Sequence, residues 1–388
     1  MQYRKMGRAG ADIGVIGLGC EHLVDMEQAA VNDIVAAALD YGANYFDIFM
    51  PQGPVRSAIG TAIKGRRDKV MLCGHLGATL DASGQYQRSR DVAHCQTFVE
   101  DFCTRLGTET IDILMLHYID ALDDLDVVTA PGGLLDHARK LQQQGVCRFI
   151  GMSSHNALVS RKLVEMGALD VLMFSINPAF DMLPGGIELD DVFNGKAFEG
   201  LDPVKNAVTL DRQALYLACQ RAGTAIVSMK TYGGGMLLAA EASNNAGIPP
   251  MTTTQLLHYA LSQPGVASVL PGCRSVAEVQ DAMAYVDATD AEKDFSSLLA
   301  ASKWDLQGKC MYCNHCLPCP QGIDIAQVTR LLHTAQDATG DSDHVKAAYA
   351  ALTAKGGDCI ACEQCNDRCP FAVDAAANMV QAAAVFGV

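Results

Sequence analysis

Basic residues are scarce in this sequence. It contains 29 lysine and arginine residues against 44 aspartate and glutamate residues, which gives a formal net charge of −15. A surface that binds nucleic acid needs clustered lysine and arginine side chains to neutralise phosphates. The acidic balance therefore excludes nucleic acid as the expected partner.

Long hydrophobic runs are also missing. No apolar stretch reaches the roughly 20 residues that a membrane-spanning helix needs, and residues 1–18 lack the pattern of an export signal. Hydrophobic residues make up 49% of the chain and charged residues 19%, which is ordinary for a soluble globular protein. We therefore expect a cytoplasmic protein with no membrane partner. Its 388 residues suffice for one domain of barrel size and one small domain.

Cysteine, in contrast, is abundant, with fifteen residues, and eight of them form two runs near the end of the sequence. Each run has three cysteines spaced three apart, followed by a fourth cysteine that precedes a proline. This is the ligand pattern of bacterial-type ferredoxins, in which thiolates hold 4Fe–4S clusters. The first run is Cys310, Cys313, Cys316 and Cys319, and the second is Cys359, Cys362, Cys365 and Cys369.

The two runs predict two 4Fe–4S clusters with crossed ligation, because the fourth cysteine of each run points to the other cluster. The first run has two residues before its last cysteine, where the common pattern has three. In this scheme Cys310, Cys313, Cys316 and Cys369 would hold one cluster. Cys359, Cys362, Cys365 and Cys319 would hold the other.

Zinc sites and disulfide bonds are the alternatives for these cysteines. Zinc sites usually use two cysteine pairs rather than triplets closed by Cys-Pro, and disulfides suit small secreted domains. Iron–sulfur ligation is therefore the favoured interpretation. The remaining cysteines are scattered through apolar segments and are expected to be buried thiols: Cys20, Cys73, Cys95, Cys103, Cys147, Cys219 and Cys273.

Short apolar segments alternate with amphipathic helical segments from residue 15 to about residue 286. The apolar segments are typical of parallel strands that are buried on both faces, and eight strand–helix units predict a (β/α)8 TIM barrel. The predicted strands are Val15–Cys20, Asn44–Phe49, Lys69–Leu76, Ile111–His117, Val146–Ser154, Val171–Asn177, Thr224–Lys230 and Val266–Cys273. The predicted helices are Ala29–Asp40, Val92–Leu106, Leu134–Gln143, Ser160–Met166, Asp211–Ala222, Thr253–Ser262 and Val276–Val286.

A doubly wound open sheet is the rival fold. That fold usually carries Gly-x-Gly-x-x-Gly after its first strand, and Gly17-Leu18-Gly19 does not complete the motif. We therefore predict an α/β barrel over residues 1–303, followed by a small α-helical ferredoxin-like domain over residues 304–388.

Smaller elements can also be predicted. Residues 1–14 should form a hairpin that closes the bottom of the barrel. Residues 178–209 form a long connection rich in proline, glycine and aspartate, which is a candidate substrate loop. Residues 288–305 are predicted as a further helix. In the small domain, Ile325–Gln336 and His344–Ala354 are predicted as helices.

Segments in order along the predicted barrel resemble the aldo/keto reductase family. They are Tyr3–Arg8, Ile16–Cys20, Tyr45–Asp47, Asp112–His117, Gly151–His155, Ser228–Lys230 with Gly233–Gly235, and Leu270–Ser275. The whole chain resembles the subgroup of this family that carries a C-terminal ferredoxin-like domain. The resemblance implies hydride transfer between NAD(P)H and a carbonyl compound.

The resemblance also implies a catalytic set of an aspartate, a tyrosine that donates a proton, a lysine that lowers the pKa of that tyrosine, and a histidine that orients the carbonyl group. Asp47 and His117 match this set. Gln52 stands at the tyrosine position and His75 at the lysine position. A glutamine amide can donate a hydrogen bond but cannot give up a proton near neutral pH, so a different acid is required.

His75 is the best local candidate for that acid, because imidazole titrates near neutral pH and contact with Asp47 would favour its charged form. His117 would then orient the substrate or share the proton. Tyr118 and Tyr232 are alternative donors. Structural roles stay open for His75 and His117, as does a polar pocket role for Gln52.

The resemblance further implies a nicotinamide nucleotide site. Ser153, Ser154 and Asn177 match positions near the carboxamide. Lys230, Gly272, Arg274 and Ser275 match positions that line the phosphates. Two interpretations stay open here, an NADP(H) site and a vacant or repurposed pocket.

We therefore expect an oxidoreductase that acts on a small organic substrate at the C-terminal end of the barrel. Protons would come from His75 and His117, and electrons from NADPH, the clusters or both. A ferredoxin-like or flavodoxin-like protein is the expected electron donor. The alternatives are a redox-neutral acid/base enzyme, such as an isomerase or dehydratase with structural clusters, and a non-catalytic electron-transfer protein.

Overall fold

The structure is a computed structural model that describes residues 1–199, 208, 210–337 and 343–387. Its residues group into two compact units. The first unit consists of Met1–Ser175, Thr224–Thr231 and Ala267–Asp287, and the second consists of Ile176–Gly223, Tyr232–Val266 and Ala288–Val388. The expected domain division at residues 303 and 304 stays a prediction.

Eight parallel strands form one sheet in the order β12-β11-β10-β9-β8-β5-β4-β3. The sheet closes on itself because Gly17 N donates to Val269 O and Val269 N donates to Val15 O, both at 2.9 Å. A Cβ on Gly17 would lie 2.6 Å from the carbonyl oxygen of Tyr45, so only glycine permits this approach. The predicted barrel is therefore confirmed. Its strands are β3 (Leu18–Gly19), β4 (Tyr45–Ile48), β5 (Met71–Leu76), β8 (Ile111–Leu116), β9 (Cys147–Ser154), β10 (Val171–Ser175), β11 (Ala225–Met229) and β12 (Val266–Val269).

The interior of the barrel is filled by every second residue of these strands. Side chains alternate between the two faces of a strand, so one set points to the barrel axis and the other to the surrounding helices. The inward set forms one buried core cluster that includes Tyr45, Cys73, Met115, Met173 and Val227. The next inward positions on the second, third and fourth strands lie at the C-terminal end of the barrel. The sequence places polar residues at those positions.

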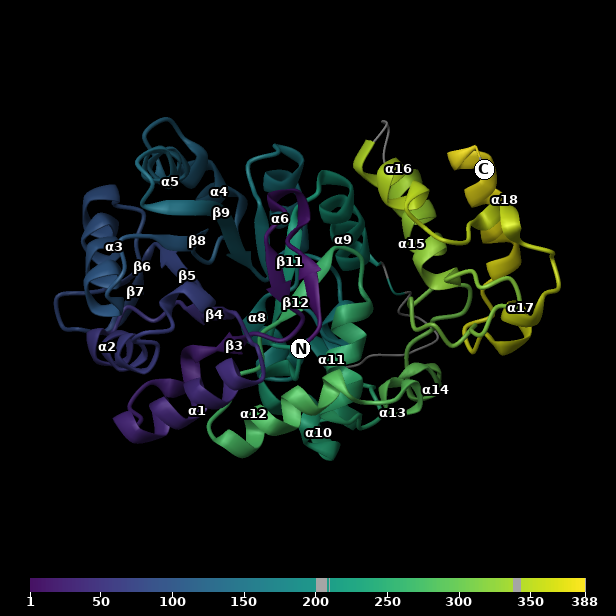
Figure 1. Cartoon of the computed structure of the whole chain (residues 1–388), viewed down its shortest axis with the longest axis horizontal. Helices are drawn as coiled ribbons and strands as arrows, with labels where there is room; N and C mark the ends of the chain where they lie inside the picture. Colours follow the sequence, from purple (N-terminus) through teal and green to yellow (C-terminus); the bar gives the residue numbers. More distant parts are fainter. Residues whose placement is uncertain (200–207, 209, 338–342, 388) are drawn as a thin grey trace. The chain divides into compact units, whose positions relative to one another are not determined.

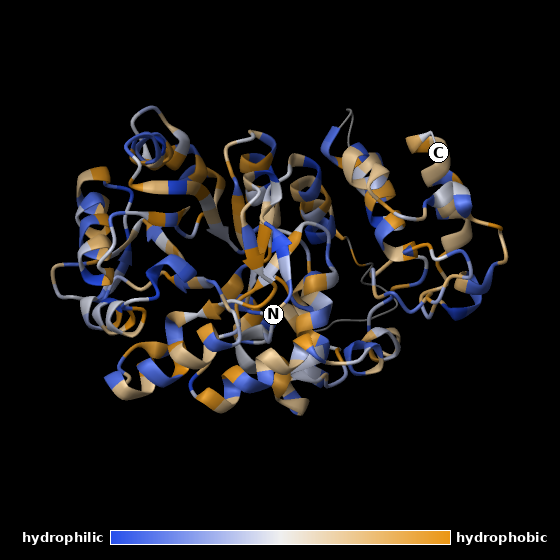
Figure 2. Cartoon of the chain, in the orientation of Figure 1, coloured by the Kyte–Doolittle hydropathy of each residue, from blue (hydrophilic) through white to orange (hydrophobic). Residues whose placement is uncertain are grey.

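Helix α3 (Val92–Leu106) shows how the sequence defines the outer helices. The Asp91 side chain caps the helix by accepting from His94 N at 2.6 Å, and Gly107 ends it in the left-handed conformation with φ of 60°. The buried residues Cys95, Val99, Phe102 and Leu106 follow the helical period. Figure 2 shows the same alternation of hydrophobic and hydrophilic residues along the outer helices, and Figure 1 shows α3 beside α2.

The other helices of the first unit follow the expected pattern, and α5 has the predicted bounds. Helix α2 and helix α4 were not among the predicted helices. The helices are α1 (Gln28–Asp40), α2 (Gly53–Ala62), α4 (Leu122–Thr129), α5 (Leu134–Gln143), α6 (Ala157–Glu165) and α12 (Val276–Met283). Four 3₁₀ turns accompany them: Gly7–Ala9, Cys20–Leu23, Arg67–Lys69 and Ala284–Val286.

Two antiparallel hairpins are attached to the barrel. The predicted N-terminal hairpin is confirmed, because β1 (Tyr3–Lys5) pairs with β2 (Asp12–Gly14). The second hairpin was not predicted. It consists of β6 (Ala78–Leu80) and β7 (Tyr86–Arg88), and it follows β5 directly.

The second unit is mainly helical, and α9, α11 and α15 have the predicted bounds. The helix predicted over residues 288–305 is wrong, because two short helices, α13 and α14, replace it. Asp294 separates them by accepting from both Ser296 N and Ser296 Oγ. The helices are α7 (Pro178–Asp181), α8 (Leu189–Phe193), α9 (Asp211–Ala222), α10 (Ala240–Asn245), α11 (Thr253–Ser262), α13 (Asp290–Lys293), α14 (Ser296–Ala300), α15 (Ile325–Gln336), α16 (Asp343–Ala350), α17 (Gln364–Arg368) and α18 (Ala375–Phe386).

Three 3₁₀ turns also belong to this unit: Lys196–Phe198, Gly233–Leu238 and Gly356–Asp358. The connection predicted as a substrate loop contains α7, α8 and the first of these turns, while residues 200–207 and 209 lie outside the described residues. Helices α15, α16 and α18 share a core cluster built on Val328, Leu331, Tyr349 and Met379.

Within the described residues, no helix combines the length and the apolar character needed to cross a membrane.

Candidate active site

The candidate active site lies where three neighbouring barrel strands end. Asp47 is on β4, His75 is on β5, and His117 directly follows β8. Each lies two residues beyond an inward-facing core residue, namely Tyr45, Cys73 and Met115. The period of two therefore points all three polar side chains into the C-terminal end of the barrel, where TIM-barrel active sites are found.

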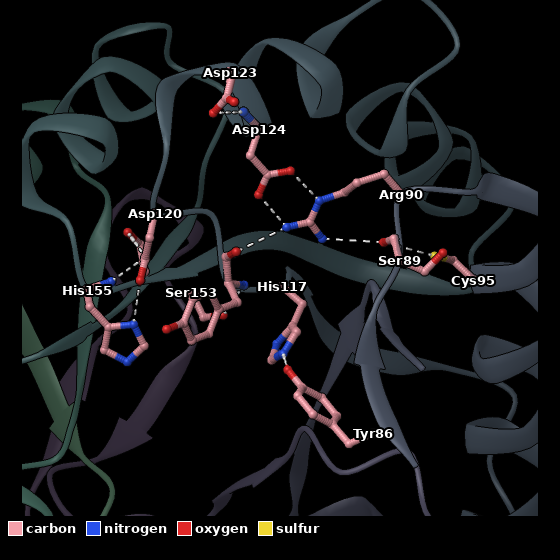
Figure 3. A network of polar contacts seen from close by, with 12 residues as sticks. Tyr86, Ser89, Arg90, Cys95, His117, Asp120, Asp123, Asp124, Ser153 and His155 are labelled. Carbon is pink, nitrogen blue, oxygen red and sulfur yellow. Dashed lines mark hydrogen bonds and ion pairs between the residues drawn. The ribbon is translucent and has the colours of Figure 1, made fainter. Parts of the chain in front are cut away.

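These side chains form a continuous hydrogen-bonded chain. His75 Nε2 lies 2.9 Å from Asp47 Oδ1, and His75 Nδ1 lies 2.8 Å from His117 Nδ1. His117 Nε2 lies 2.6 Å from the phenol oxygen of Tyr86, whose side chain points at the imidazole in Figure 3. We call Asp47, His75, His117 and Tyr86 the imidazole chain.

The contacts of the imidazole chain distinguish between the two roles predicted for His117, which are orienting the substrate and sharing the proton. Both ring nitrogens of His117 already have partners, and so do both ring nitrogens of His75. A histidine in that state can pass a proton between its partners, whereas it has no free nitrogen with which to hold a substrate carbonyl. The geometry therefore favours sharing of the proton.

Burial keeps two members of the imidazole chain, His117 and Tyr86, uncharged. Burial is the largest cause that lowers the pKa of His117 well below 6.5, and the nearby charges of His75, Arg90 and Arg88 lower it further. The pKa of Tyr86 is raised, mainly by burial, although the charges of Arg88 and Arg90 oppose the shift. Both groups are therefore held in their neutral forms near pH 7.

Aromatic packing holds the imidazoles in place. Phe49, which directly follows β4, stacks on the His117 ring with centroids 5.7 Å apart and an interplanar angle of 11°. It also meets His75 and Tyr86 edge to face, at 6.0 Å and 6.3 Å. The sequence prediction did not identify Phe49 as part of the site.

A second set of contacts fixes the segment after His117. Arg90 donates to both carboxylate oxygens of Asp124 at 2.6 Å, and it donates to the carbonyl oxygen of Tyr118 at 3.0 Å (Figure 3). Tyr118 N donates to Ser153 Oγ at 2.9 Å. These contacts hold Tyr118 in the left-handed region, with φ of 52°, at an energetic cost that the surroundings must offset.

Asp120 organises a neighbouring polar cluster. It accepts from Ser154 Oγ at 2.8 Å and from His155 N at 2.7 Å, and its second oxygen lies 2.9 Å from His155 Nδ1. Burial, the largest single effect, raises the pKa of Asp120, but the hydrogen bonds and charge of His155 together leave that pKa below its ordinary value. Ser153 and Ser154, predicted near the carboxamide, are thus both engaged in protein hydrogen bonds.

Gln52 lies in the loop between β4 and α2. It occupies the N-cap position of α2, and its Oε1 atom is buried without a hydrogen-bond partner among the described residues. Arg56 fixes the same loop by donating to Met50 O at 2.8 Å and to Asp101 at 3.0 Å. An acceptor of this kind suits a ligand that carries a hydroxyl or amide donor.

The residues predicted to contact the nucleotide phosphates lie after β11 and at the start of α12. Lys230 directly follows β11 with φ of 54°, and burial lowers its pKa. Ser275 caps α12 by accepting from Glu278 N at 3.2 Å, and the Glu278 carboxylate accepts from Arg274 N at 2.6 Å. A carboxylate therefore occupies the helix N-terminus where a phosphate would otherwise be favoured.

Two further predicted residues have structural partners. A Cβ on Gly272 would overlap the His22 side chain, so a larger residue here would displace that imidazole. Asn177 caps α7 by accepting from Ala179 N at 3.1 Å and from Phe180 N at 2.9 Å.

Asp47, Cys73 and His75 together offer one carboxylate, one thiol and one imidazole, with donor atoms within 4.8 Å of one another. Such a set suits a zinc-like cation. The 2.9 Å hydrogen bond between His75 and Asp47 already uses two of the three donor atoms, however, and burial raises the pKa of the Cys73 thiol.

The eight cysteines of the two runs line two cavities. Each cavity is lined by cysteines of both runs, as crossed ligation requires, and Cys316 lines both cavities. One is lined by Cys310, Cys313, Cys316 and Cys369, and the other by Cys319, Cys359, Cys362 and Cys365.

The backbone around the two runs repeats. In the first run Tyr312 and Asn314 adopt positive φ, and in the second run Ala361 and Glu363 do so at the equivalent positions. Gly322 and Ala372 repeat the pattern three residues after the Cys-Pro cysteines. Asp324 and Asp374 then cap α15 and α18, again at matching positions. The two segments are therefore structural repeats, each with its chain curled inwards around a cavity.

Comparison with known proteins defines the class of the chain. Residues 14–193 match the model of the aldo/keto reductase family. Together with the oxidoreductase relative described next, this match identifies the chain as an oxidoreductase.

Individual relatives agree with this class. The uncharacterized oxidoreductase YqkF of Bacillus subtilis is 26% identical over 321 residues, which cover 79% of this chain and 98% of that protein. The aldo-keto reductase AKR11C1 from Bacillus halodurans, in its holo form, is 21% identical with a TM-score of 0.58 and covers 76% of this chain and 94% of that one. An aldo/keto reductase from Klebsiella pneumoniae in complex with NADP and acetate is 18% identical, with a TM-score of 0.50 and coverage of 74% and 91%.

Proposed function

We propose that this chain is an iron–sulfur oxidoreductase that reduces a small organic substrate at the C-terminal end of its barrel. His75 and His117 supply the proton, and the electrons come from NAD(P)H, from two 4Fe–4S clusters, or from both. The observation that carries the proposal is the unbroken path of hydrogen bonds from Asp47 through His75 to His117. It stands at the site where the related family carries out its chemistry.

The cysteine geometry supports the clusters. Four thiols line each cavity, and each triplet is wrapped by a backbone with two left-handed residues, which turns three cysteines towards one centre. Cys310, Cys313, Cys316 and Cys369 would hold one cluster, and Cys319, Cys359, Cys362 and Cys365 the other. When bound, such clusters supply and accept single electrons.

A nicotinamide nucleotide is also supported, since the Klebsiella pneumoniae structure of the same fold holds NADP. Ser153 and Ser154 would face the carboxamide, and Lys230 would contact the phosphates. Glu278 at the start of α12 disfavours a further phosphate there, because two negative charges would share one helix N-terminus. We therefore expect NADH to bind at least as tightly as NADPH.

The chemical role of the histidines follows from charge. Reduction of a carbonyl group at its carbon leaves negative charge on oxygen, which must receive a proton. Asp47 holds His75 through its Nε2 atom at 2.9 Å, and His117 extends the path from His75 Nδ1 to Tyr86. Because glutamine replaces the family tyrosine, reductive cleavage of an activated C–O bond or reduction of an unusual carbonyl fits better than ordinary ketone reduction.

A redox-neutral reaction is the second candidate, because two coupled imidazoles also suit isomerisation or dehydration. The two functions differ in one measurable way. A dehydratase would convert a β-hydroxy carbonyl compound at the same rate whether the clusters are oxidised or reduced, whereas the proposed reductase requires a reductant.

The test uses anaerobic, cluster-loaded protein with a 1,2-diketone and a quinone as probes. NADH, NADPH and reduced methyl viologen serve in parallel as reductants. We expect turnover with at least one of them, and a decrease of about 10²- to 10⁴-fold in His75→Ala. His344→Ala, which changes an exposed histidine on α16, is the matched control and should leave the rate unchanged. Absence of turnover with every reductant, or an unchanged rate in His75→Ala, would reject the proposal.

A further inference from the structure

We propose that Tyr86, on the β6–β7 hairpin, is the residue that hands the proton to the substrate, and that Asp47, His75 and His117 reload it. This inference rests on the proposed function and names the group that passes the proton of His75 and His117 to the substrate. Tyr86 lies outside the segments that resemble the aldo/keto reductase family, on the hairpin that follows β5.

Exposure separates Tyr86 from the rest of the imidazole chain. Asp47, His75 and His117 are 8%, 6% and 5% exposed, whereas Tyr86 is 42% exposed. Its phenol oxygen nevertheless lies only 2.6 Å from His117 Nε2. Tyr86 is thus the member of the chain that contacts the buried imidazoles and can also meet a molecule arriving from solvent.

The hairpin is built to hold Tyr86 in one position. Asp81 closes the turn by accepting from Ser83 N at 2.8 Å and from Gln85 N at 2.9 Å, and Leu80 pairs with Tyr86 across the strands. Gly77, with φ of 108°, lets the chain leave β5 sharply enough to form the hairpin. The Tyr86 ring also packs edge to face against His117, with centroids 6.0 Å apart. A preorganised donor of this kind loses little entropy on reaction.

The number of protons on the chain sets the direction of every hydrogen bond in it. Without an extra proton, His75 Nε2–H donates to Asp47, His117 Nδ1–H donates to His75, and the Tyr86 hydroxyl donates to His117. With one extra proton, both nitrogens of His75 donate, His117 Nε2–H donates to the phenol oxygen, and the Tyr86 hydroxyl is released to donate outwards. Only the second state presents an acid to the substrate.

The transfer step balances with one proton and no further reactant. As the substrate oxygen gains negative charge, the Tyr86 O–H bond breaks and a substrate O–H bond forms. The phenol oxygen takes the proton of His117 Nε2, and His117 Nδ1 takes the proton of His75 Nδ1. The chain ends with neutral His75 bonded to the Asp47 carboxylate, and solvent restores the missing proton.

The charges that face Tyr86 suit this role. Arg88 on β7 and Arg90, two residues after its end, stabilise negative charge that develops on the phenol oxygen, while Glu21 on the 3₁₀ turn Cys20–Leu23 opposes it. The remaining titratable partner is His117, and the neutral ring of Phe49 covers the other side. The two cations offset part of the burial effect that raises the pKa of Tyr86, and they stabilise the phenol oxygen while its proton passes to the substrate.

The test compares Tyr86→Phe with Tyr41→Phe, a matched change at an exposed tyrosine outside the site. Phenylalanine keeps the ring contacts and removes only the hydroxyl. With the diketone or quinone probe, we expect kcat to fall about 10²- to 10⁴-fold in Tyr86→Phe, with KM changed less than about threefold. The decrease of kcat with rising pH, which the proton-loaded state imposes on the wild type, should disappear. Tyr41→Phe should match the wild type.

The outcomes separate the inference from the function on which it rests. Wild-type turnover combined with an unchanged kcat and pH profile in Tyr86→Phe overturns the role of Tyr86 and leaves the proposed function intact. A change confined to KM also overturns it, because the hydroxyl would then only bind substrate. Failure of the wild-type protein with every probe and reductant rejects the proposed function and the inference together.

Discussion

Both nitrogens of His117 are engaged inside the protein, and this determines how the residue responds to pH. Burial and the neighbouring charges lower its pKa in the folded state, so the unfolded chain binds the proton more readily than the folded chain does. A group of this kind contributes stability that is complete above about pH 6.5 and is lost as the pH falls below that value.

We therefore predict that the free energy of unfolding decreases more steeply below pH 6.5 in the wild type than in His117→Asn. The difference in slope should reach up to about 1.4 kcal/mol per pH unit. Anaerobic urea titrations at pH 7.5, 6.5 and 5.5 measure it. His137 and His333, whose pKa values are also lowered mainly by burial, remain in both proteins and cancel. Parallel slopes for the two proteins would show that His117 is not buried as described.

At this scale the sequence predicted three of the four members of the imidazole chain. Asp47, His75 and His117 were identified because they stand at positions that match the catalytic set of the family that the barrel resembles, near the ends of neighbouring strands. Tyr86 could not be identified, because its position depends on a hairpin whose strands are three residues long. Tyrosine in a short polar segment looks the same whether it faces solvent or a catalytic histidine.

Helix α9 and helix α11 carry a buried ionic network at the scale of secondary-structure elements. Asp181 on α7 accepts from Arg212 Nε at 3.1 Å and from Tyr216 at 2.6 Å, and its other oxygen accepts from Tyr259 at 2.9 Å. Arg212 is 1% exposed and Asp181 6%. Burial raises the pKa of Asp181, although the charge of Arg212 and the two phenols oppose the shift.

Removing one ion of this network should be costly, because it leaves the other charge buried and uncompensated. We predict that Arg212→Met lowers the free energy of unfolding by about 3–5 kcal/mol. The double change Asp181→Leu with Arg212→Met should recover a substantial part of that loss.

The matched control is Arg161→Met, which removes an exposed ion pair with Glu165 and should cost about 0–1 kcal/mol. Denaturant unfolding of the four proteins measures these differences. Equal losses for Arg212→Met and Arg161→Met would contradict the description of the network.

Element bounds were predicted best where caps and apolar periodicity agree. Helix α3 combines an Asp91 cap, four buried residues at the helical period and a terminal glycine, and it was predicted to the residue. The helix expected over residues 288–305 failed because Asp294 and Thr289 form local side-chain hydrogen bonds that compete with a continuous helix. The hydrophobic periodicity of a sequence does not show whether such side-chain hydrogen bonds form.

At the scale of the whole molecule, the cysteine repeats are the feature that distinguishes this chain from a simple barrel. Each repeat ends in a capped helix, and these helices share one core cluster with α16. The crossed arrangement makes the two cysteine runs depend on each other, because each cavity is lined by cysteines of both runs.

Crossed ligation makes a specific prediction. Cys369→Ser should damage the cluster of the first triplet, Cys310, Cys313 and Cys316, although Cys369 belongs to the second run. Cys362→Ser should damage the other cluster. If the two clusters give distinguishable electron paramagnetic resonance signals, each variant should lose a different one. Loss of the same signal in both variants would instead indicate that each run holds its own cluster.

The proposal that this chain holds two iron–sulfur clusters is tested most directly by metal analysis of anaerobically purified protein with spin quantification after dithionite reduction. The account predicts about eight iron atoms and two reducible spin centres per chain. Protein that is iron-free when prepared anaerobically, or that holds zinc in the cysteine cavities, would contradict it.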